Sequence, residues 1–234
     1  MHDLVFLITG ASTGIGAATA RLASEHGYRL VLASRDGTRL QALADELGGP
    51  SRAVAISCDV TDWQQVKNLE ERTAEVFGRL DAAFVNAGVV SGAPLLGDHD
   101  TPQEWRQMVL TNVYGAAITA HALWPLLQAS QGHLILTGSV AGRVTVPGSL
   151  YSATKWAITG LGQSLRSAAA GSNARVTVVH PGLVDAGTIA PDRRTDPKLA
   201  PEDVARAVLF ALAQPPTVDI NEIVIRPTGQ SPAR

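Results

Sequence analysis

The sequence is poor in several kinds of residue, and each shortage narrows what the protein can be. Cys58 is the only cysteine among the 234 residues, so no disulfide can form within the chain. Such cysteine usage suits a reducing compartment, and we expect a cytoplasmic protein. The N-terminal residues MHDLVFLITG lack the basic region of a signal peptide, and we expect none.

Excess charge of either sign is also missing. Nineteen Lys and Arg residues against 21 Asp and Glu residues give a formal net charge of −2, and no block of basic residues stands out. We therefore expect no binding to nucleic acid or to an anionic membrane surface. The six histidines (2, 26, 99, 121, 133 and 180) lack the paired spacing of metal ligands, so we expect no metal site.

The longest region without charge runs from Gln107 to Gly142. Asn112, Pro125 and other polar or small residues interrupt it too often for a membrane span. We expect instead a helix buried on most of its faces, followed by a buried strand. A helix buried all round needs protein on every side, which predicts a homo-oligomer, either a dimer or a tetramer, with residues 107–128 in its interface.

Short β-rich runs alternate with helical patterns along the chain. The predicted strands are 4–9, 29–34, 52–57, 82–86, 133–138, 175–180 and 221–226, and the predicted helices are about 13–26, 37–47, 62–78, 101–129, 149–170 and 201–213. Continuous apolar strands indicate a sheet whose two faces are both covered. The alternation predicts an α/β protein with a single domain over residues 1–234, built on a doubly wound, seven-stranded parallel sheet with helices on both faces. Ligands of such sheets bind at the carboxyl ends of the strands.

Two segments lack a regular pattern. Residues 181–200 follow the end of a predicted strand, where long loops often carry function; the alternative is a plain surface excursion. The segment after Pro181 is short for a substrate lid, which predicts an open pocket. Residues 227–234 (PTGQSPAR) are expected to form a flexible tail.

A glycine-rich turn, TGASTGIG, joins the first predicted strand to the first predicted helix, with glycines at 10, 14 and 16. Gly10 permits a sharp bend, and Gly16 permits the helix to pack closely on the sheet. The amides of the loop and of the helix N-terminus would then face a pyrophosphate. A purely structural turn is the alternative, but its place at the start of a β-α series favours nucleotide binding.

These motifs resemble those of the short-chain dehydrogenases/reductases, and the resemblance extends from residue 4 to about residue 228. TGASTGIG looks like the cofactor motif of that family, and Asp59-Val60 resembles the pair that contacts adenine. Asn86-Ala87-Gly88 resembles the family's N-A-G element, and Pro181-Gly182 resembles its P-G turn. The resemblance implies a Rossmann fold and a nicotinamide cofactor. The cofactor-binding residues that it implies are Gly10, Ser12, Thr13, Gly14, Ile15, Gly16, Ser34, Arg35, Asp59, Val60, Asn86, Ala87, Gly88, Tyr151, Lys155, Pro181, Gly182, Val184 and Thr188.

The end of the second predicted strand bears on the choice between NAD and NADP. A carboxylate there would accept hydrogen bonds from the ribose hydroxyls, whereas a 2′-phosphate needs a cation and donors. The sequence has Ser34 and Arg35, with Ser34 where NAD-type members of the family carry an acid. A guanidinium can hold a phosphate bidentately, and Ser34 and Thr13 can add hydroxyl donors, so we expect NADP(H). In the alternative, Arg35 is a solvated loop residue paired with Asp36.

Lys155 is isolated from other charges. Between Arg106 and Arg166 the only formally charged residues are Arg143 and Lys155. Tyr151 and Lys155 are four residues apart, so they share one face of a predicted helix. An ammonium near a phenol favours the phenolate and lowers its pKa from about 10 toward the working range. An ordinary amphipathic pair is the alternative, and the uncharged surroundings do not favour it.

The family resemblance assigns catalytic roles to Asn112, Ser139, Tyr151 and Lys155. It implies that Tyr151 transfers a proton to or from the substrate oxygen, to which Ser139 donates a hydrogen bond. It also implies that Lys155 holds the nicotinamide ribose and that Asn112 supports a water relay to Lys155. In the alternative for Asn112, the side chain bonds a neighbouring backbone group.

The chain departs from the family pattern at two places near the substrate. Ser139 and Tyr151 are twelve positions apart where many members have thirteen, which predicts a loop shorter by one residue. Ala186 stands where the P-G-x-V-x-T pattern has its threonine, which makes Thr188 the candidate for that hydroxyl contact.

We therefore expect an NADP(H)-dependent oxidoreductase that interconverts a carbonyl and an alcohol, with a small ketone, aldehyde or 3-hydroxy acid as its substrate. NEIVIRPTGQ and YSATKWA resemble a subgroup that acts on 3-hydroxy acids and serine-like substrates. The candidate apolar neighbours of the substrate are Val90, Val140, Leu150 and Leu183, and the candidate cations for a carboxylate are Arg143, Arg193 and Arg194. Two alternatives stay open. One is a 3-oxoacyl-thioester reductase, and the other is a non-catalytic NADPH-sensing protein.

Overall fold

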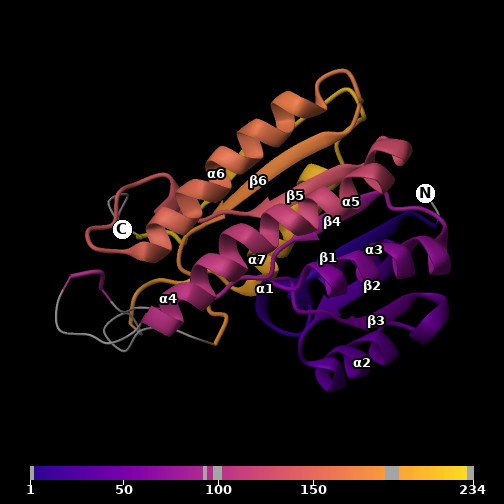
Figure 1. Cartoon of the computed structure of the whole chain (residues 1–234), viewed down its shortest axis with the longest axis horizontal. Coiled ribbons are helices and arrows are strands. Elements are labelled where there is room, and N and C mark those ends of the chain that lie inside the picture. The colour runs from indigo at the N-terminus through magenta and orange to yellow at the C-terminus, as the bar shows by residue number, and fades with distance from the viewer. Residues whose placement is uncertain (1–2, 92–93, 97–101, 188–194, 231–234) are drawn as a thin grey trace.

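The structure is a computed structural model and describes residues 3–91, 94–96, 102–187 and 195–230. Seven parallel strands form one sheet in the order β3-β2-β1-β4-β5-β6-β7 (Figure 1). They are β1 (Val5–Thr9), β2 (Arg29–Ser34), β3 (Ala53–Ser57), β4 (Ala82–Val85), β5 (His133–Thr137), β6 (Arg175–Pro181) and β7 (Glu222–Ile225). The predicted α/β fold is confirmed, and no predicted strand end differs by more than one residue from the observed end.

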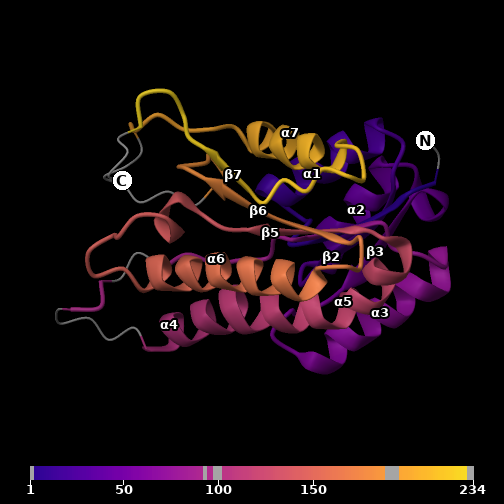
Figure 2. The same ribbon diagram turned by 90° about the horizontal axis from the view of Figure 1, so that it is seen from above.

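Helices cover both faces of the sheet (Figure 2). One face carries α3 (Trp63–Phe77), α4 (Pro102–Val109), α5 (Ala116–Ser130) and α6 (Leu150–Ala169), and the other carries α1 (Gly14–Glu25), α2 (Gly37–Glu46) and α7 (Pro201–Leu212). The strand order reverses between β1 and β4. The helices that follow these two strands therefore lie on opposite faces, and a crevice opens between them at the carboxyl ends.

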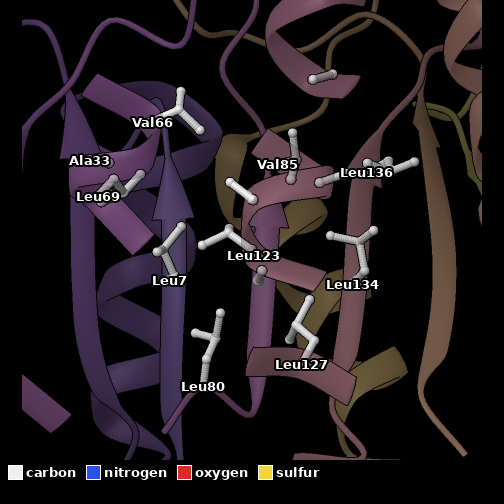
Figure 3. Close-up of a cluster of buried hydrophobic side chains, with 14 of the residues drawn as sticks. Leu7, Ala33, Val66, Leu69, Leu80, Val85, Leu123, Leu127, Leu134 and Leu136 are labelled. Atoms are coloured by element: carbon white, nitrogen blue, oxygen red, sulfur yellow. The ribbon is translucent and has the colours of Figure 1, made fainter. Parts of the chain in front are cut away.

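Each face of the sheet has its own apolar core. Leu123 and Leu127 of α5 lie over side chains of the central strands, among them Leu7, Val85 and Leu134 (Figure 3). On the other face, Phe6, Ile8 and Phe84 belong to the second cluster with residues of α1, α2 and α7. Burial of each large side chain contributes about 1.5–3 kcal/mol, so both helical layers are fixed against the sheet that carries the crevice.

The predicted helix over 101–129 is interrupted. Between α4 and α5 the chain forms a π-helical segment, Leu110–Gly115 (η2). The segment passes close to the loop after β3, because a Cβ at Gly115 would lie 2.9 Å from Val60 Cγ2. Single π-turns are frequent at functional sites, and this one contains Asn112. No helix in the described parts of the chain has both the length and the apolar character needed to cross a membrane.

After β6 the chain leaves the sheet, and residues 183–185 pair with Leu199 farther along the chain. We call this paired contact the neck. Val184 forms an isolated parallel bridge with Leu199. The Leu199 amide donates to the carbonyl of Leu183 over 2.8 Å, and the Asp185 amide donates to the carbonyl of Leu199 over 2.9 Å. These bonds hold residues 183–185 against Leu199 beside the crevice.

Candidate active site

A cavity of about 1040 Å³ lies over the carboxyl ends of the strands and connects the glycine-rich turn to Tyr151. The predicted site residues that line it are Gly10, Ser12, Thr13, Gly14, Ile15, Ser34, Arg35, Asp59, Val60, Asn86, Ala87, Gly88, Ser139, Tyr151, Lys155, Pro181, Gly182 and Val184. The predicted substrate neighbours Val90, Val140 and Leu183 line it too, whereas Leu150 does not. Gly16 and Asn112 are not among its lining residues, and Thr188, Arg193 and Arg194 fall outside the described residues.

The glycine-rich turn depends on backbone conformations that other residues rarely adopt. Gly10 has φ 65° and Gly14 has φ 53°, both in the left-handed region that favours glycine. A Cβ at Gly16 would overlap the carbonyl oxygen of Gly10, so glycine lets α1 start directly against the turn. The side chain of Thr13 does not cap α1. The first amides of α1 therefore stay available to an anion, as pyrophosphate binding requires.

Asn86 ties the turn to the neighbouring strand ends. Its Nδ2 donates to the carbonyl of Thr9 over 3.1 Å, and its Oδ1 accepts from Thr137 Oγ1 over 3.1 Å. Thr9 Oγ1 accepts in turn from the amides of Asn86 (3.0 Å) and Ala87 (3.2 Å). These bonds join β1, β4 and β5 at the crevice, so Asn86 shapes the wall through contacts within the protein.

At the far end of the cavity, Ser34 and Arg35 follow β2, and Arg35 is exposed. Asp36 pairs with Arg39 (Nε–Oδ2 3.3 Å) and caps α2 through the Arg39 amide. Within the described residues Arg35 forms no ion pair, so the predicted alternative pairing with Asp36 is wrong: Arg39 holds that carboxylate. A cation without a fixed partner beside a hydroxyl suits a 2′-phosphate.

Hydrogen bonds hold the loop after β3 at one end of the cavity, where Asp59 and Val60 are predicted to contact adenine. Asp59 Oδ1 accepts from the amide and the hydroxyl of Thr61 over 2.9 and 2.8 Å, and the Asp59 amide donates to Gln65 Oε1. Cys58 also lines this end. Burial, helped by Asp59 and Asp62, raises the pKa of its thiol to about 12, which leaves it unreactive.

Lys155 is buried at the opposite end, with 5% of its surface exposed. Its Nζ donates to the carbonyl of Thr137 over 2.7 Å and lies 5.7 Å from the centre of the Tyr151 ring. Burial lowers the pKa of Lys155 to about 8. Lys155 and Arg35 are the only lysine and arginine among the described residues that line the cavity, and they lie at its two ends.

Tyr151 does not show the lowered pKa that its spacing from Lys155 predicts. In the protein alone, burial raises the pKa of the Tyr151 phenol, and the hydrogen bond with Ser139 opposes that effect. The physical reason is that the Lys155 ammonium is bonded to Thr137 and not to the phenol, so it offsets little of the desolvation.

Ser139 is held by a backbone hydrogen bond that leaves its hydroxyl free to act as a donor. It lies at the start of a 3-10 turn, Val140–Gly142 (η3), and its Oγ accepts from the Ala141 amide over 3.1 Å. Since the amide occupies an acceptor position of the oxygen, the hydroxyl is free to donate to Tyr151 or to a substrate oxygen in the same place.

The Asn112 side chain joins the loop after β4 to α6 through hydrogen bonds. Its Oδ1 accepts from the amide of Val89 over 2.8 Å, and its Nδ2 donates to the carbonyl of Val89 (2.9 Å) and to Thr154 Oγ1 (3.2 Å). Two of these three bonds go to the backbone of Val89, as the alternative predicts, and the third reaches a side chain of α6. The water relay to Lys155 stays a prediction. The π-turn aims Asn112 at the loop after β4 and at α6, which carries Tyr151 and Lys155.

Among the lining residues that sequence reasoning missed, two hold other parts of the site through hydrogen bonds. Thr137 supplies the carbonyl that holds Lys155, and no sequence signal marks it beyond its place at the end of a strand. Gln230 comes from the predicted tail, yet it lines the cavity, and its Oε1 accepts from the amide of Leu183 over 3.2 Å. Gln230 therefore forms part of the wall, although the sequence places it in the predicted tail. In the described part of the chain, no group of three or more His, Cys, Asp or Glu residues could hold a metal ion.

Known proteins resemble this chain over nearly its whole length. A family model described as short chain dehydrogenase matches residues 4–197. An uncharacterized oxidoreductase of Staphylococcus aureus strain USA300 is 40% identical over 230 residues, which cover 97% of this chain and 98% of the relative.

Solved structures agree with the geometry. An alcohol dehydrogenase from the archaeon Thermococcus sibiricus, complexed with 5-hydroxy-NADP, superposes with a TM-score of 0.89 at 28% identity, covering 98% of this chain and 99% of the other. A 3-ketoacyl-(acyl-carrier-protein) reductase from Brucella melitensis, complexed with NADH, gives 0.86 at 25% identity, covering 95% and 96%.

Proposed function

Because the chain belongs to the short-chain dehydrogenase family, we propose that this oxidoreductase uses NADP(H) to interconvert a small carbonyl compound and its alcohol. One observation carries the proposal. A single cavity has the glycine-rich turn and Arg35 at one end and Ser139, Tyr151 and Lys155 at the other. The spacing suits a dinucleotide whose nicotinamide reaches the phenol.

The roles of the reacting residues follow from their positions. The nicotinamide, when bound, supplies or accepts the hydride. Tyr151 gives a proton to the carbonyl oxygen, or takes it from the alcohol, and Ser139 donates a hydrogen bond to the same oxygen. Lys155 binds the nicotinamide ribose. Asn112 keeps the loop at Val89 against α6, which holds Gly88 near Lys155; a Cβ at Gly88 would be 3.8 Å from Lys155 Nζ.

The preference for NADP(H) over NAD(H) rests on Ser34 and Arg35. No carboxylate occupies the position of Ser34, and the nearest one, on Asp36, is already paired with Arg39. A 2′-phosphate would gain charge-assisted hydrogen bonds from Arg35, and the NAD ribose would find no acceptor at Ser34. Thr188 and Gly182 are proposed as further contacts of the cofactor near Val184.

An uncharged carbonyl compound is the substrate class that the cavity wall favours. Apolar side chains from Val90, Val140, Val146, Pro147 and Leu183 line the reacting end. In the described part of that end, Lys155 is the only lysine or arginine, and it is committed to the ribose. Arg143 would reach a substrate carboxylate only by leaving Glu222, with which it pairs at 3.1 Å. The 3-hydroxy acid subgroup therefore ranks second, together with a 3-oxoacyl-thioester reductase, which the similarity to the Brucella enzyme favours.

The test is a panel of carbonyl compounds assayed with NADPH and with NADH by the absorbance of the reduced nicotinamide. Each acid is matched with its methyl ester, so that the pair differs in charge alone. We expect turnover with NADPH and higher kcat/KM for the ester. Higher kcat/KM for the acid would favour the 3-hydroxy acid reading, and activity confined to acyl thioesters would favour the reductase. Tight NADPH binding without turnover on any compound would indicate a sensor and overturn the proposal.

We also propose that the protein forms a dimer or tetramer in the cytoplasm and that residues 107–128 contribute to the interface. Val109 and Tyr114 of this region, and Trp156 on α6, are exposed large apolar side chains, as is common at interfaces. Sedimentation at micromolar concentration should give a dimer or larger species. A monomer would overturn the assignment of this surface.

A further inference from the structure

His180 is a buried polar residue to which the reaction gives no role. It lies near the end of β6, and its side chain is fully buried. Its Nδ1 is 3.1 Å from the carbonyl oxygen of Ser139. Because a carbonyl only accepts, Nδ1 carries the hydrogen in this contact. Burial lowers the pKa of His180 despite the opposing effects of the Ser139 carbonyl and Glu222, so the ring is neutral near pH 7 and has one hydrogen to donate.

The His180 ring lies directly against the backbone that carries Ser139. A Cβ at Gly138 would lie only 2.5 Å from His180 Nδ1, so the ring occupies space that any other residue at 138 would fill. The carbonyl of Ser139 also accepts from the amide of Gly142 over 2.9 Å. Two donors from different elements therefore fix the peptide that follows Ser139.

The other ring nitrogen faces an ion pair. His180 Nε2 has no hydrogen-bond partner among the described residues, and it lies 3.5 Å from Glu222 Oε2 on β7. Glu222 is closer to Arg143, whose Nη1 lies 3.1 Å from the same carboxylate oxygen. Arg143 directly follows the turn Val140–Gly142. The contacts therefore run from Ser139 to His180 on β6, then to Glu222 on β7, and back to the turn through Arg143.

The ion pair bears on which nitrogen of His180 carries the hydrogen. A bare carboxylate beside Nε2 would attract the hydrogen to that nitrogen and leave Nδ1 as a lone pair facing the Ser139 carbonyl. Arg143 neutralises Glu222 and weakens that attraction. The shorter contact, to Ser139, then keeps the hydrogen on Nδ1.

We propose that His180 is a positioning residue for Ser139 and that the Arg143–Glu222 pair keeps its hydrogen on Nδ1. The inference rests on the proposed function, since it assigns His180 an effect on the step in which Ser139 binds the substrate oxygen. A misplaced hydroxyl would weaken the hydrogen bond that forms as charge develops on that oxygen. The chemical step should therefore suffer more than the binding of cofactor or substrate.

Two substitutions of His180 separate its hydrogen bond from its packing. His180→Phe keeps a ring without a donor, and His180→Asn keeps an N–H donor near the position of Nδ1. With an uncharged ketone and NADPH, we expect His180→Phe to lower kcat on the order of ten-fold with KM and the NADPH Kd unchanged. His180→Asn should recover most of that loss. Equal kcat in the two variants and the wild type would overturn the proposal, as would an equal loss in both.

The tautomer gives a test that needs neither turnover nor a folded His180 variant. In ¹⁵N-labelled wild-type protein, the His180 ring nitrogens should report hydrogen on Nδ1, and Arg143→Met should move it toward Nε2 and lower kcat. Arg72→Met, which removes a surface pair with Glu75 (2.6 Å), is the matched control and should change neither. Hydrogen on Nε2 in the wild type would overturn the proposal. Absence of turnover in the wild type would instead overturn the proposed function, and the nitrogen shifts would still decide the role of His180.

Discussion

The nucleotide end of the cavity is built from backbone groups and exposed side chains, whereas the reacting end is built from buried polar side chains. Gly10 and Gly14 supply left-handed turns, and the exposed Arg35 supplies charge. At the reacting end, Ser139 and Lys155 are almost fully buried and bonded to other parts of the protein. In the proposed function, the first end would bind a large anion whose charge stays solvated, and the second would place a few atoms for one chemical step.

This difference implies that the two ends respond to different kinds of change. The reacting end depends on individual atoms, because burial strengthens each interaction and leaves no water to replace a lost one. The nucleotide end depends on chain conformation and on the sign of the charge. Variants at each end should therefore separate turnover from cofactor binding.

The largest effect is expected at the phenol. Tyr151→Phe removes the proton donor without changing the ring, and kcat should fall about 10³-fold, within the range for loss of a general acid or base. The NADPH Kd from fluorescence titration should stay within about two-fold of the wild type, since uniform binding is little affected. Tyr114→Phe, at an exposed tyrosine outside the cavity, is the control. Retained turnover in Tyr151→Phe would show that another group transfers the proton.

At the nucleotide end, reversal of charge should exchange the cofactors. Arg35→Asp removes a charge-assisted contact with the 2′-phosphate and places a carboxylate beside it. The ratio of kcat/KM for NADPH over NADH should fall about 100-fold, mostly through KM. Arg72→Asp makes the same charge change on α3 and should leave the ratio nearly constant. An unchanged ratio in Arg35→Asp would locate the phosphate contact elsewhere.

Burial of Lys155 is expected to lower the free energy of unfolding of the protein at neutral pH. Its folded pKa of about 8 lies below the ordinary 10.5, so the unfolded chain binds more protons between these values and this group's contribution to stability rises with pH there. Lys155→Met should abolish most activity. It should also raise the free energy of unfolding at pH 7 by roughly 2 kcal/mol, after the lost bond to Thr137. Urea titrations should show that gain shrinking from pH 8 toward pH 10.5. A gain that does not depend on pH would contradict the assigned cause.

The smallest effects concern two helical glycines with opposite surroundings. A Cβ at Gly16 would overlap the Gly10 carbonyl, whereas a Cβ at Gly160 on α6 would meet nothing within 4 Å. Gly16→Ala should lower the free energy of unfolding by at least about 1 kcal/mol and weaken NADPH binding. Gly160→Ala should raise it by about 0.5–1 kcal/mol through helix propensity alone. Urea unfolding of both measures the difference, and equal signs would refute the close approach at Gly16.

The sequence predicted the parts of the molecule that local rules determine. All seven strands follow from short apolar runs, and the glycine turn follows from spacing, because both features repeat over neighbouring residues. The π-helical segment around Asn112 could not be predicted from the sequence pattern. The segment lies against Val60 and Val89, which are distant in the sequence, so no local pattern records its surroundings.

The burial and hydrogen-bond partners of the site residues were less predictable from the sequence than the identity of those residues. The spacing of Tyr151 and Lys155 indicated a shared helix face correctly. It carried no information on burial, which raises the pKa of Tyr151 and lowers that of Lys155, or on the bond from Lys155 to the carbonyl of Thr137. Gln230 was assigned to a tail because PTGQSPAR is polar and terminal. Its position against Gly182 depends on the return of the chain from β7, which no local pattern records.

The neck formed by Val184 and Leu199 marks the two points at which residues 185–198 join the rest of the fold. Everything between these residues begins and ends at one bridge, so a loop of different length or composition can be exchanged there without disturbing the sheet. The same neck lies next to Leu183, which lines the reacting end of the cavity. A change between Val184 and Leu199 is therefore expected to act on the cavity through Leu183 and to leave the positions of Ser139, Tyr151 and Lys155 unchanged.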